Sequence, residues 1–292
     1  MTTKNALVGL WAETSLHAGA GSSVDGIDLP IQREGHSQWP CVFGSSVKGA
    51  LRTKAEDILG KGNSSVEFVF GHDSSSEKTS DHAGALLVSD ARLLLLPVRS
   101  LTSHFKWVTC PAILERLIRD SQRLGMKIDF TVPSTDKETA VTASMEAVDL
   151  FLEEYRFNTV TQNLSALITV LSSVTGIDST ALTNQLVIVH DDQFSYLAKY
   201  ATPVTPHIAI DNEKKVVKAG ALWYEETLPA ETALYFALNA HKSREKESSM
   251  SAESILSCIT DNLLGDSPYL QIGGNETLGM GWCKVTVLPQ EA

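Results

Sequence analysis

The chain has 292 residues, enough for a sizeable hydrophobic core, and its content of 43% hydrophobic and 20% charged residues is ordinary for a globular protein. A net charge of −11 argues against a protein that coats nucleic acid indiscriminately, although a local basic track stays compatible with it. No run of eighteen apolar residues and no signal-peptide pattern occur, so we expect no membrane span.

The cysteines give no sign of a metal site. They form no CxxC pair and have no matching histidine spacing, so a zinc site is not expected and a reducing cytoplasm fits best. The four are Cys41, Cys110, Cys258 and Cys283.

The first hundred residues predict a strand, a helix and a polar insertion. Residues 5–13 alternate enough to be a strand. A helix is expected over 44–60, with Ser45 or Ser46 as its N-cap and an apolar face on one side. Residues 60–84 are rich in serine, aspartate and glycine around a short apolar "VEFVF", which predicts a mobile insertion.

The middle of the chain alternates between strand and helix patterns. The nearly continuous apolar run 84–100 predicts a buried strand, and Pro111 is expected to open a helix that stops at Gly125. Residues 148–160 alternate like a strand, 164–176 resemble a helix, and 186–192 predict another strand.

The last third begins with a predicted hairpin. Two β-rich arms in 205–229 flank the polar tip "DNEKK", a helix is expected over 252–265, and 269–288 predict strand, glycine loop and strand. With no internal repeat and no clear linker, one α+β unit is the simplest architecture.

Several short motifs are candidate sites, each with a structural alternative. Lys48 and Arg52 lie four apart on one side of a helix near its start, as in a phosphate site, or they form a solvated charged face. His17 lies among small residues that leave room for a ligand, or it is a loop residue. Asp90 and Arg92 indicate a buried ion pair or a carboxylate that binds backbone.

The glycine loop near the C-terminus permits close approach of a ligand to the backbone. A strand follows it where a dinucleotide fingerprint needs a helix, and no P-loop motif occurs. A hairpin with a bulge is the alternative. Its glycines are Gly273, Gly274, Gly279 and Gly281.

The stretch "VDGIDLPIQREGH", residues 24–36, combines acids and bases on an irregular backbone. Gly26 and Pro30 disfavour a helix there, so Asp25 and Asp28 lie on a loop. The loop is either a solvated turn or a segment that holds a carboxylate against a substrate.

Taken in order, these segments resemble one family. "LHAGAGSSVDGIDLPIQREGHSQWPCVFGSSVKGALR", "VSDARLLLLPVRS", "GALWYEETLP" and "QIGGNETLGMGW" are similar to the RAMP superfamily of CRISPR proteins, and within it to the backbone subunit of the type III-B (Cmr) effector complex. The resemblance covers residues 7 to about 287. It implies one α+β RAMP domain over 1–292: a ferredoxin-like palm, related to the RNA recognition motif, with inserted loops and a protruding thumb β-hairpin.

The resemblance also implies a function in antiviral defence. Copies of such a subunit stack along one guide (CRISPR) RNA as a helical filament, together with other Cmr-complex subunits. Complementary target RNA is cut beside each thumb in a reaction that needs a divalent metal ion, Mg or Mn. No membrane is involved, and the complex is cytoplasmic.

Residue by residue, the resemblance assigns roles to most of the motifs. Asp28 matches the cleavage aspartate and is expected to bind the metal, with Asp25 only its neighbour. Guide phosphates are assigned to Lys48 and Arg52. RNA binding is also expected of His17 and of the four glycines of the loop. The hairpin near 203–222 is the expected thumb.

Three alternatives stay open at this point. The first is a guide-binding scaffold without chemistry, which leaves Asp28 without a role. The second is a stand-alone RAMP endoribonuclease that processes CRISPR transcripts. The third is a metabolic enzyme that uses the glycine loop for a nucleotide.

Overall fold

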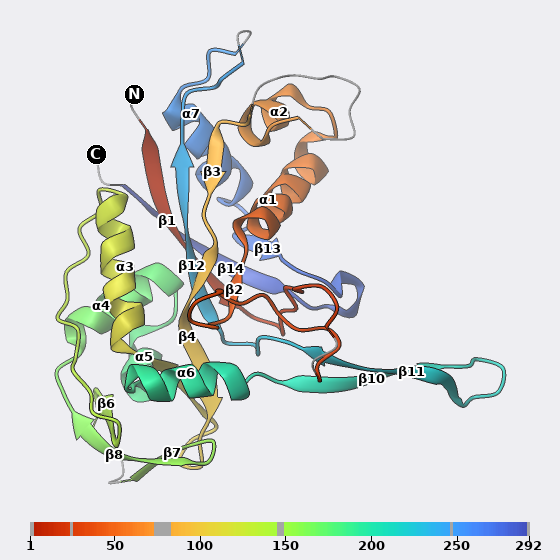
Figure 1. Cartoon of the computed structure of the whole chain (residues 1–292). Coiled ribbons are helices and arrows are strands. Elements are labelled where there is room, and N and C mark those ends of the chain that lie inside the picture. The colour runs from red at the N-terminus through yellow and green to blue at the C-terminus, as the bar shows by residue number, and fades with distance from the viewer. Residues whose placement is uncertain (1–2, 24–25, 73–82, 145–148, 246–247, 291–292) are drawn as a thin grey trace.

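One large sheet forms the centre of the protein (Figure 1), and the computed structural model describes residues 3–23, 26–72, 83–144, 149–245 and 248–290. Its strands, in chain order, are β1 (Lys4–Ala12), β2 (Cys41–Val42), β3 (Leu86–Val88), β4 (Ala91–Arg99), β5 (Phe105–Thr109), β6 (Thr139–Thr142), β7 (Asp149–Leu152), β8 (Tyr155–Thr161), β9 (Leu186–Ile188), β12 (Ala233–Ala240), β13 (Tyr269–Gln271) and β14 (Trp282–Pro289). Across the sheet the order is β13-β14-β1-β12-β4-β5-β9-β6-β8-β7, with β2 on β4 and β3 on β12.

The helices fall into two groups in Figure 1, with α1, α2 and α7 in one and α3 to α6 in the other. The helices are α1 (Gly44–Leu59), α2 (Ser64–Phe70), α3 (Pro111–Arg123), α4 (Ser165–Thr175), α5 (Ser179–Gln185), α6 (Asp191–Tyr200) and α7 (Ala252–Ser257). A π-helical turn, Cys258–Leu263, continues α7, and a 3₁₀ turn, Glu276–Leu278, lies in the glycine loop.

Strands β1, β12 and β4 lie side by side and form the centre of the core. Their residues are buried almost without interruption, because helices or loops cover both faces of the sheet at this point. β1 pairs antiparallel with both β12 and β14, and β12 pairs antiparallel with β4. The sequence "ALYFALNA" of β12 gave no strand prediction, although it lies at the middle of the sheet.

The helix predicted over 44–60 is confirmed as α1, but its expected cap is wrong. Ser45 and Ser46 lie inside the helix, and the N-cap residue is Phe43, which makes no side-chain cap. The Gly44 N–H instead donates to Asp90 Oδ1 at 2.7 Å. Asp90 is therefore the backbone-binding carboxylate that the sequence suggested, while Arg92 pairs with Asp120 and not with Asp90.

Three predicted segments are divided differently in the structure. The run 84–100 is two strands, β3 and β4, and the described part of the predicted strand 148–160 is a hairpin of β7 and β8. The predicted strand 186–192 ends early, because α6 begins within it.

Inside the insertion 60–84, the apolar "VEFVF" belongs to helix α2, which starts where the Asn63 side chain accepts from the Ser65 N–H. The rest of that insertion, 73–82, lies outside the described residues.

A long two-stranded hairpin projects from the body of the protein (Figure 1). It consists of β10 (Val204–Ile210) and β11 (Val217–Glu226), so its second arm runs beyond the predicted 203–222. At the tip, Asp211 Oδ1 accepts the N–H groups of Glu213 and Lys214 and holds the turn.

None of the helices in the described part of the chain is long and apolar enough to cross a membrane.

Gly9 and Gly49 offer a matched test of the packing. Gly9→Ala should cost about 3 kcal/mol of unfolding free energy, because a Cβ there would lie 1.8 Å from the Val174 carbonyl oxygen of α4. Gly49→Ala meets nothing within 4 Å in the middle of α1 and should stabilise the protein by about 0.5–1 kcal/mol. Urea unfolding measures both, and a shift of the same sign for the two variants would contradict this packing.

Candidate functional site

The loop that carries Asp28 lies against the root of the hairpin. The Leu29 N–H donates to the Tyr224 carbonyl at 3.0 Å, and the Glu226 N–H donates to the Leu29 carbonyl at 3.0 Å. Leu29 forms a parallel bridge with Glu225. This loop therefore follows the last residues of β11 like a short additional strand.

A buried carboxylate, Glu226, fixes this arrangement. It is 3% exposed, accepts the Ile31 N–H at 3.1 Å and the Thr202 hydroxyl at 2.7 Å, and pairs with Arg33 at 2.5 Å. Residues of the loop and of the segment before β10 therefore contact one carboxylate at the end of β11. Without these partners the charge would be very costly to bury.

Two other charged residues of the loop have structural roles. Arg33 also donates to the carbonyl of Ala198 at the end of α6. Glu34 pairs with Arg116 of α3 at 2.6 Å, and the Arg116 guanidinium lies over the Trp39 ring, 5.3 Å from its centroid. The acids and bases of this stretch therefore mostly fasten the loop to the fold.

Asp28 differs from them because it is exposed. Its Oδ2 accepts the Tyr224 N–H of β11 at 2.7 Å. Its other carboxylate oxygen has no hydrogen-bond partner among the residues described. A carboxylate so held is oriented by the hairpin strand while one oxygen faces solvent. Asp25 lies outside the described residues.

The structure brings His17 and the glycine loop together. The Gly274 N–H donates to the His17 carbonyl at 2.8 Å. Gly273 has φ +86°, and a Cβ there would lie 2.3 Å from the same carbonyl oxygen, so the close approach requires glycine. Gly281, at φ +80°, approaches the Ile272 carbonyl in the same way. Gly279 also has a positive φ, but its added Cβ would meet nothing within 4 Å.

His17 is itself buried, at 9% exposure. Its Nδ1 lies 2.7 Å from the Glu226 carbonyl oxygen, and because a carbonyl only accepts, Nδ1 carries the proton. Direct binding of RNA by His17 and by the four glycines stays a prediction. In the structure, Gly273 and Gly274 pack on the His17 backbone, and His17 donates to the Glu226 carbonyl at the root of the hairpin.

Sequence reasoning missed a second carboxylate, Glu225. It is 4% exposed, and its Oε1 accepts from the Asn275 side-chain amide of the glycine loop. His17 and His207 lie within 3.6 and 3.8 Å of its two oxygens. The segment "GALWYEETLP" carried part of the family resemblance, but nothing local shows that its paired acids face inward.

Lys48 and Arg52 of α1 have different surroundings. Arg52 donates to Glu56 at 2.7 Å and to the Gly71 carbonyl at 3.0 Å, so it joins α1 to the end of α2. Lys48 makes no such contact among the described residues. Burial lowers the pKa of Lys48, and the positive charges of Arg52 and Arg244 lower it further.

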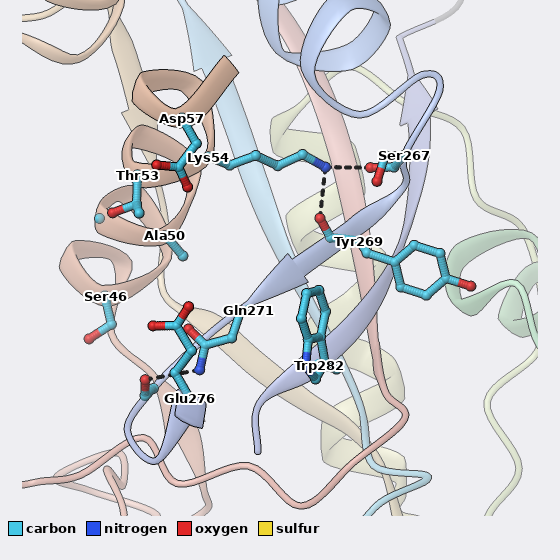
Figure 2. Close-up of a pocket in the computed structure, with 12 residues that line it drawn as sticks. Ser46, Ala50, Thr53, Lys54, Asp57, Ser267, Tyr269, Gln271, Glu276 and Trp282 are labelled. Atoms are coloured by element: carbon cyan, nitrogen blue, oxygen red, sulfur yellow. Dashed lines mark hydrogen bonds between the residues drawn. The ribbon is translucent and has the colours of Figure 1, made fainter. Parts of the chain in front are cut away.

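A pocket of about 510 Å³ lies between α1 and the glycine loop (Figure 2). Lys54 crosses it and donates to the backbone carbonyls of Ser267 and Tyr269. Asp57 and Glu276 also line it, so its charge does not favour phosphate. Lys48 is two residues from both Ser46 and Ala50, which line this pocket, and therefore lies on the opposite side of the helix.

Removing the charge of Glu226 tests whether it holds the loop. Glu226→Gln should lower the free energy of unfolding by about 3 kcal/mol, because Arg33 is left as an unpaired, largely buried cation. Asp149→Asn, which breaks the exposed cross-strand pair with Arg156, should cost at most about 1 kcal/mol. Chemical unfolding of the two variants gives the comparison, and equal losses would rule out the special role of Glu226.

The comparisons with known proteins agree on one family. A sequence profile of the RAMP superfamily matches residues 11–284. The CRISPR system Cmr endoribonuclease Cmr4 of Pyrococcus furiosus is 33% identical over 289 residues, which cover 96% of this chain and 95% of that protein. The CRISPR system CMR subunit Cmr4 of Saccharolobus solfataricus is 24% identical over 307 residues, at 92% of each chain.

Solved structures show the same fold. The crystal structure of oligomeric Cmr4 from Pyrococcus furiosus superposes with a TM-score of 0.76 at 26% identity and covers 100% of both chains. A chain in the type III-B Cmr-beta complex bound to cognate target RNA gives 0.73 at 20% identity, with 98% of this chain and 97% of that chain covered. By profile, sequence and structure, the chain belongs to the RAMP superfamily.

Proposed function

We propose that this protein is the backbone subunit of a type III-B RNA-guided effector complex, and that it cuts target RNA complementary to its guide. The observation that carries the proposal is the placement of Asp28, an exposed carboxylate fastened to the root of a projecting hairpin. The similarity to a protein named an endoribonuclease supports the activity. The similarity to an oligomeric structure supports association of several copies. Guide RNA and other Cmr subunits are the further partners that the proposal includes.

The strand order supports a ferredoxin-like palm. In chain order, β1, α1, β4, β12, α7 and β14 follow the pattern strand, helix, strand, strand, helix, strand. In the sheet the four strands lie in the order β14-β1-β12-β4, and every neighbouring pair is antiparallel. The elements between β4 and β12, which include the hairpin, are then insertions into the palm.

The hairpin fits the role of the thumb. Two strands alone are marginally stable, and these expose apolar side chains that a folded monomer would normally bury. A nucleic-acid duplex opened at this point would cover them with bases. The exposed residues are Val204, Ile208, Ile210, Val216, Val217, Leu222 and Tyr224.

The proposed chemistry uses the target RNA's own 2′-hydroxyl. The hydroxyl loses its proton to solvent and its oxygen attacks the adjacent phosphorus; the 5′-oxygen of the next nucleotide leaves and takes up a proton from solvent, and a 2′,3′-cyclic phosphate forms. The protein contributes by holding the in-line geometry and by providing charge at the reacting phosphate. Asp28 is placed for this, since Tyr224 fixes one of its oxygens and the other faces solvent.

A divalent ion such as Mg or Mn fits Asp28 only together with substrate oxygens. Within the described residues, no group of three His, Cys, Asp or Glu side chains is arranged to hold a metal ion. Magnesium commonly takes one or two carboxylates, phosphate oxygens and water, which an exposed Asp28 can share. Such an ion would stabilise negative charge on the phosphate.

Asp28→Asn is the direct test of the chemistry. Cleavage of a labelled target RNA by the reconstituted complex should fall about a hundredfold or more, because the charge is lost while the shape is kept. Guide binding and target capture should stay near the parental level, and Asp25→Asn should be much milder. Reactions with Mg, with Mn and with chelator test the metal, and a 2′-deoxy nucleotide 5′ of the scissile phosphate should block that cut alone.

Cutting at the parental rate by Asp28→Asn would favour the non-catalytic scaffold. Failure of this variant to assemble would make Asp28 a structural residue.

Shortening the hairpin tests the thumb. Replacing residues 209–221 by Asn-Gly keeps the root pairs from Val204–Glu226 to Ile208–Leu222 and thus the anchor of Asp28. The variant should fold and bind guide RNA, but it should lose the regular spacing of cuts, because the duplex is no longer opened at each copy. Gel analysis of the cleavage products shows the spacing, and an unchanged ladder would exclude this hairpin as the thumb.

A further inference from the structure

The projecting hairpin consists of two ladders of paired residues with a break between them. The root ladder contains five consecutive pairs and ends at Ile208–Leu222. The next pair outward is Ile210–Val217. One residue of β10 separates these two pairs on one arm, whereas four residues of β11, 218–221, separate them on the other. Such a bulge leaves its extra residues without ladder partners and bends the strand that carries them.

The root, residues 204–208 and 222–226, is fixed to the body of the protein. Leu29 exchanges hydrogen bonds with its inner end, and the buried carboxylate at position 226 ties it to the preceding loop. The rings of His207 and Trp223 stack across its two strands, with 5.5 Å between their centroids. The root therefore has partners outside the hairpin as well as within it.

The tip, residues 210–217, is a small unit with its own hydrogen bonds. The Asp211 N–H donates to the Val216 carbonyl at 2.8 Å, and the Lys215 N–H donates to the Asp211 carbonyl at 2.8 Å. The tip lies at the far end of the hairpin in Figure 1. Within the described part of the chain, no hydrogen bond or ion pair joins residues 209–221 to a residue outside the hairpin. The tip is therefore attached to the protein only through the bulge and Ala209.

The bulge itself offers little resistance to a change of direction. Three of its residues, Ala219, Gly220 and Ala221, have small side chains or none. Gly220 has φ +76°, and a Cβ added to it would meet nothing within 4 Å. A glycine adopts this conformation and its neighbours in φ and ψ at low cost, and hinges are often made of small residues at the end of an element.

We infer that the bulge 218–221 is a hinge on which the tip turns relative to the root, and that this motion lets the tip move aside while target RNA pairs with the guide. Base pairing has to extend on both sides of the hairpin, and an arm that yields lowers the barrier to it. Asp28 is bound to Tyr224 of the root and keeps its place during the motion. The use of the hinge rests on the proposed function, whereas the hinge itself does not.

Two doubly spin-labelled variants of the full-length protein measure the motion without RNA. One carries labels at Glu213→Cys in the tip and Ala166→Cys in α4, and the other at Thr205→Cys in the root and Ala166→Cys. These three positions are exposed, and Cys258→Ser removes the one cysteine that is not buried. The distance distribution from tip to α4 should be about twice as broad as that from root to α4, because only the tip moves on the bulge.

Deleting residues 218–220 removes the hinge and keeps the root. Ala221 then stands opposite Ala209, and the ladder runs without a break from root to tip. The tip distribution should narrow to the width of the root distribution. In the reconstituted complex, target capture should become about tenfold slower, as expected when a required motion is blocked. Guide affinity and the single-turnover rate of cutting captured target should stay within about twofold, because the root still holds Asp28.

Insertion of two glycines after Gly220 is the matched control. It also changes the length of β11, but it lengthens the bulge and keeps both ladders, so the tip distribution should stay broad and capture should stay at the parental rate. Lys218→Ala keeps the bulge and removes the one charge that the deletion takes away, and it should also capture target like the parent.

The hinge is excluded if the parental tip is as narrowly distributed as the root, or if the tip stays broad after the deletion. Its use in target pairing is excluded by capture at the parental rate in the deletion variant. Equal slowing by the deletion and the insertion would mean that exact hairpin length matters and motion does not. Loss of guide binding on deletion would make the bulge a support of the root, against the inference. If the parental protein binds no guide, the proposed function fails, while the label distances still show whether the hinge exists.

Discussion

The buried carboxylate of Glu226 is the interaction on which the arrangement of the site depends. Residues 31 and 33, Thr202 and the end of β11 are far apart in the chain, yet all of them meet at this one side chain. Burying a charge is costly unless it is paired and hydrogen-bonded, so a shift of any one segment would take away one of the partners of a buried ion. The loop, the hairpin root and the end of α6 are therefore fastened to one another.

This constraint explains how an exposed loop can hold a side chain with the precision that chemistry needs. The Asp28 backbone follows β11, and its carboxylate accepts a backbone N–H from that strand, so its orientation is set by a sheet rather than by loop conformation. His17 and the glycine loop contact the same end of β11, because His17 donates to the Glu226 carbonyl and the Asn275 side-chain amide donates to Glu225. Asp28 on the loop is exposed, whereas Glu225 and Glu226 at the end of β11 are buried.

Much of the fold could be predicted from sequence, because local patterns decide most elements. Pro111 begins α3, and Gly176 ends α4 in a left-handed conformation, as periodicity and capping indicate. The strand β12 was missed because a short apolar run without turn signals has no distinctive pattern. The site was predicted less completely: Lys48 and Arg52 look alike in sequence, and only the tertiary structure pairs Arg52 with Glu56 and brings Arg244 next to Lys48.

The hairpin has a consequence for how this protein could diversify. Its outer half is exposed on both arms, whereas its root is tied to the core through Glu226 and the Leu29 backbone. Insertions or deletions near the tip would change little of the buried surface, while changes at the root would disturb a buried ion pair. The length of the hairpin can therefore change without moving Asp28. An engineer could lengthen or shorten the hairpin and keep the carboxylate at its root in place.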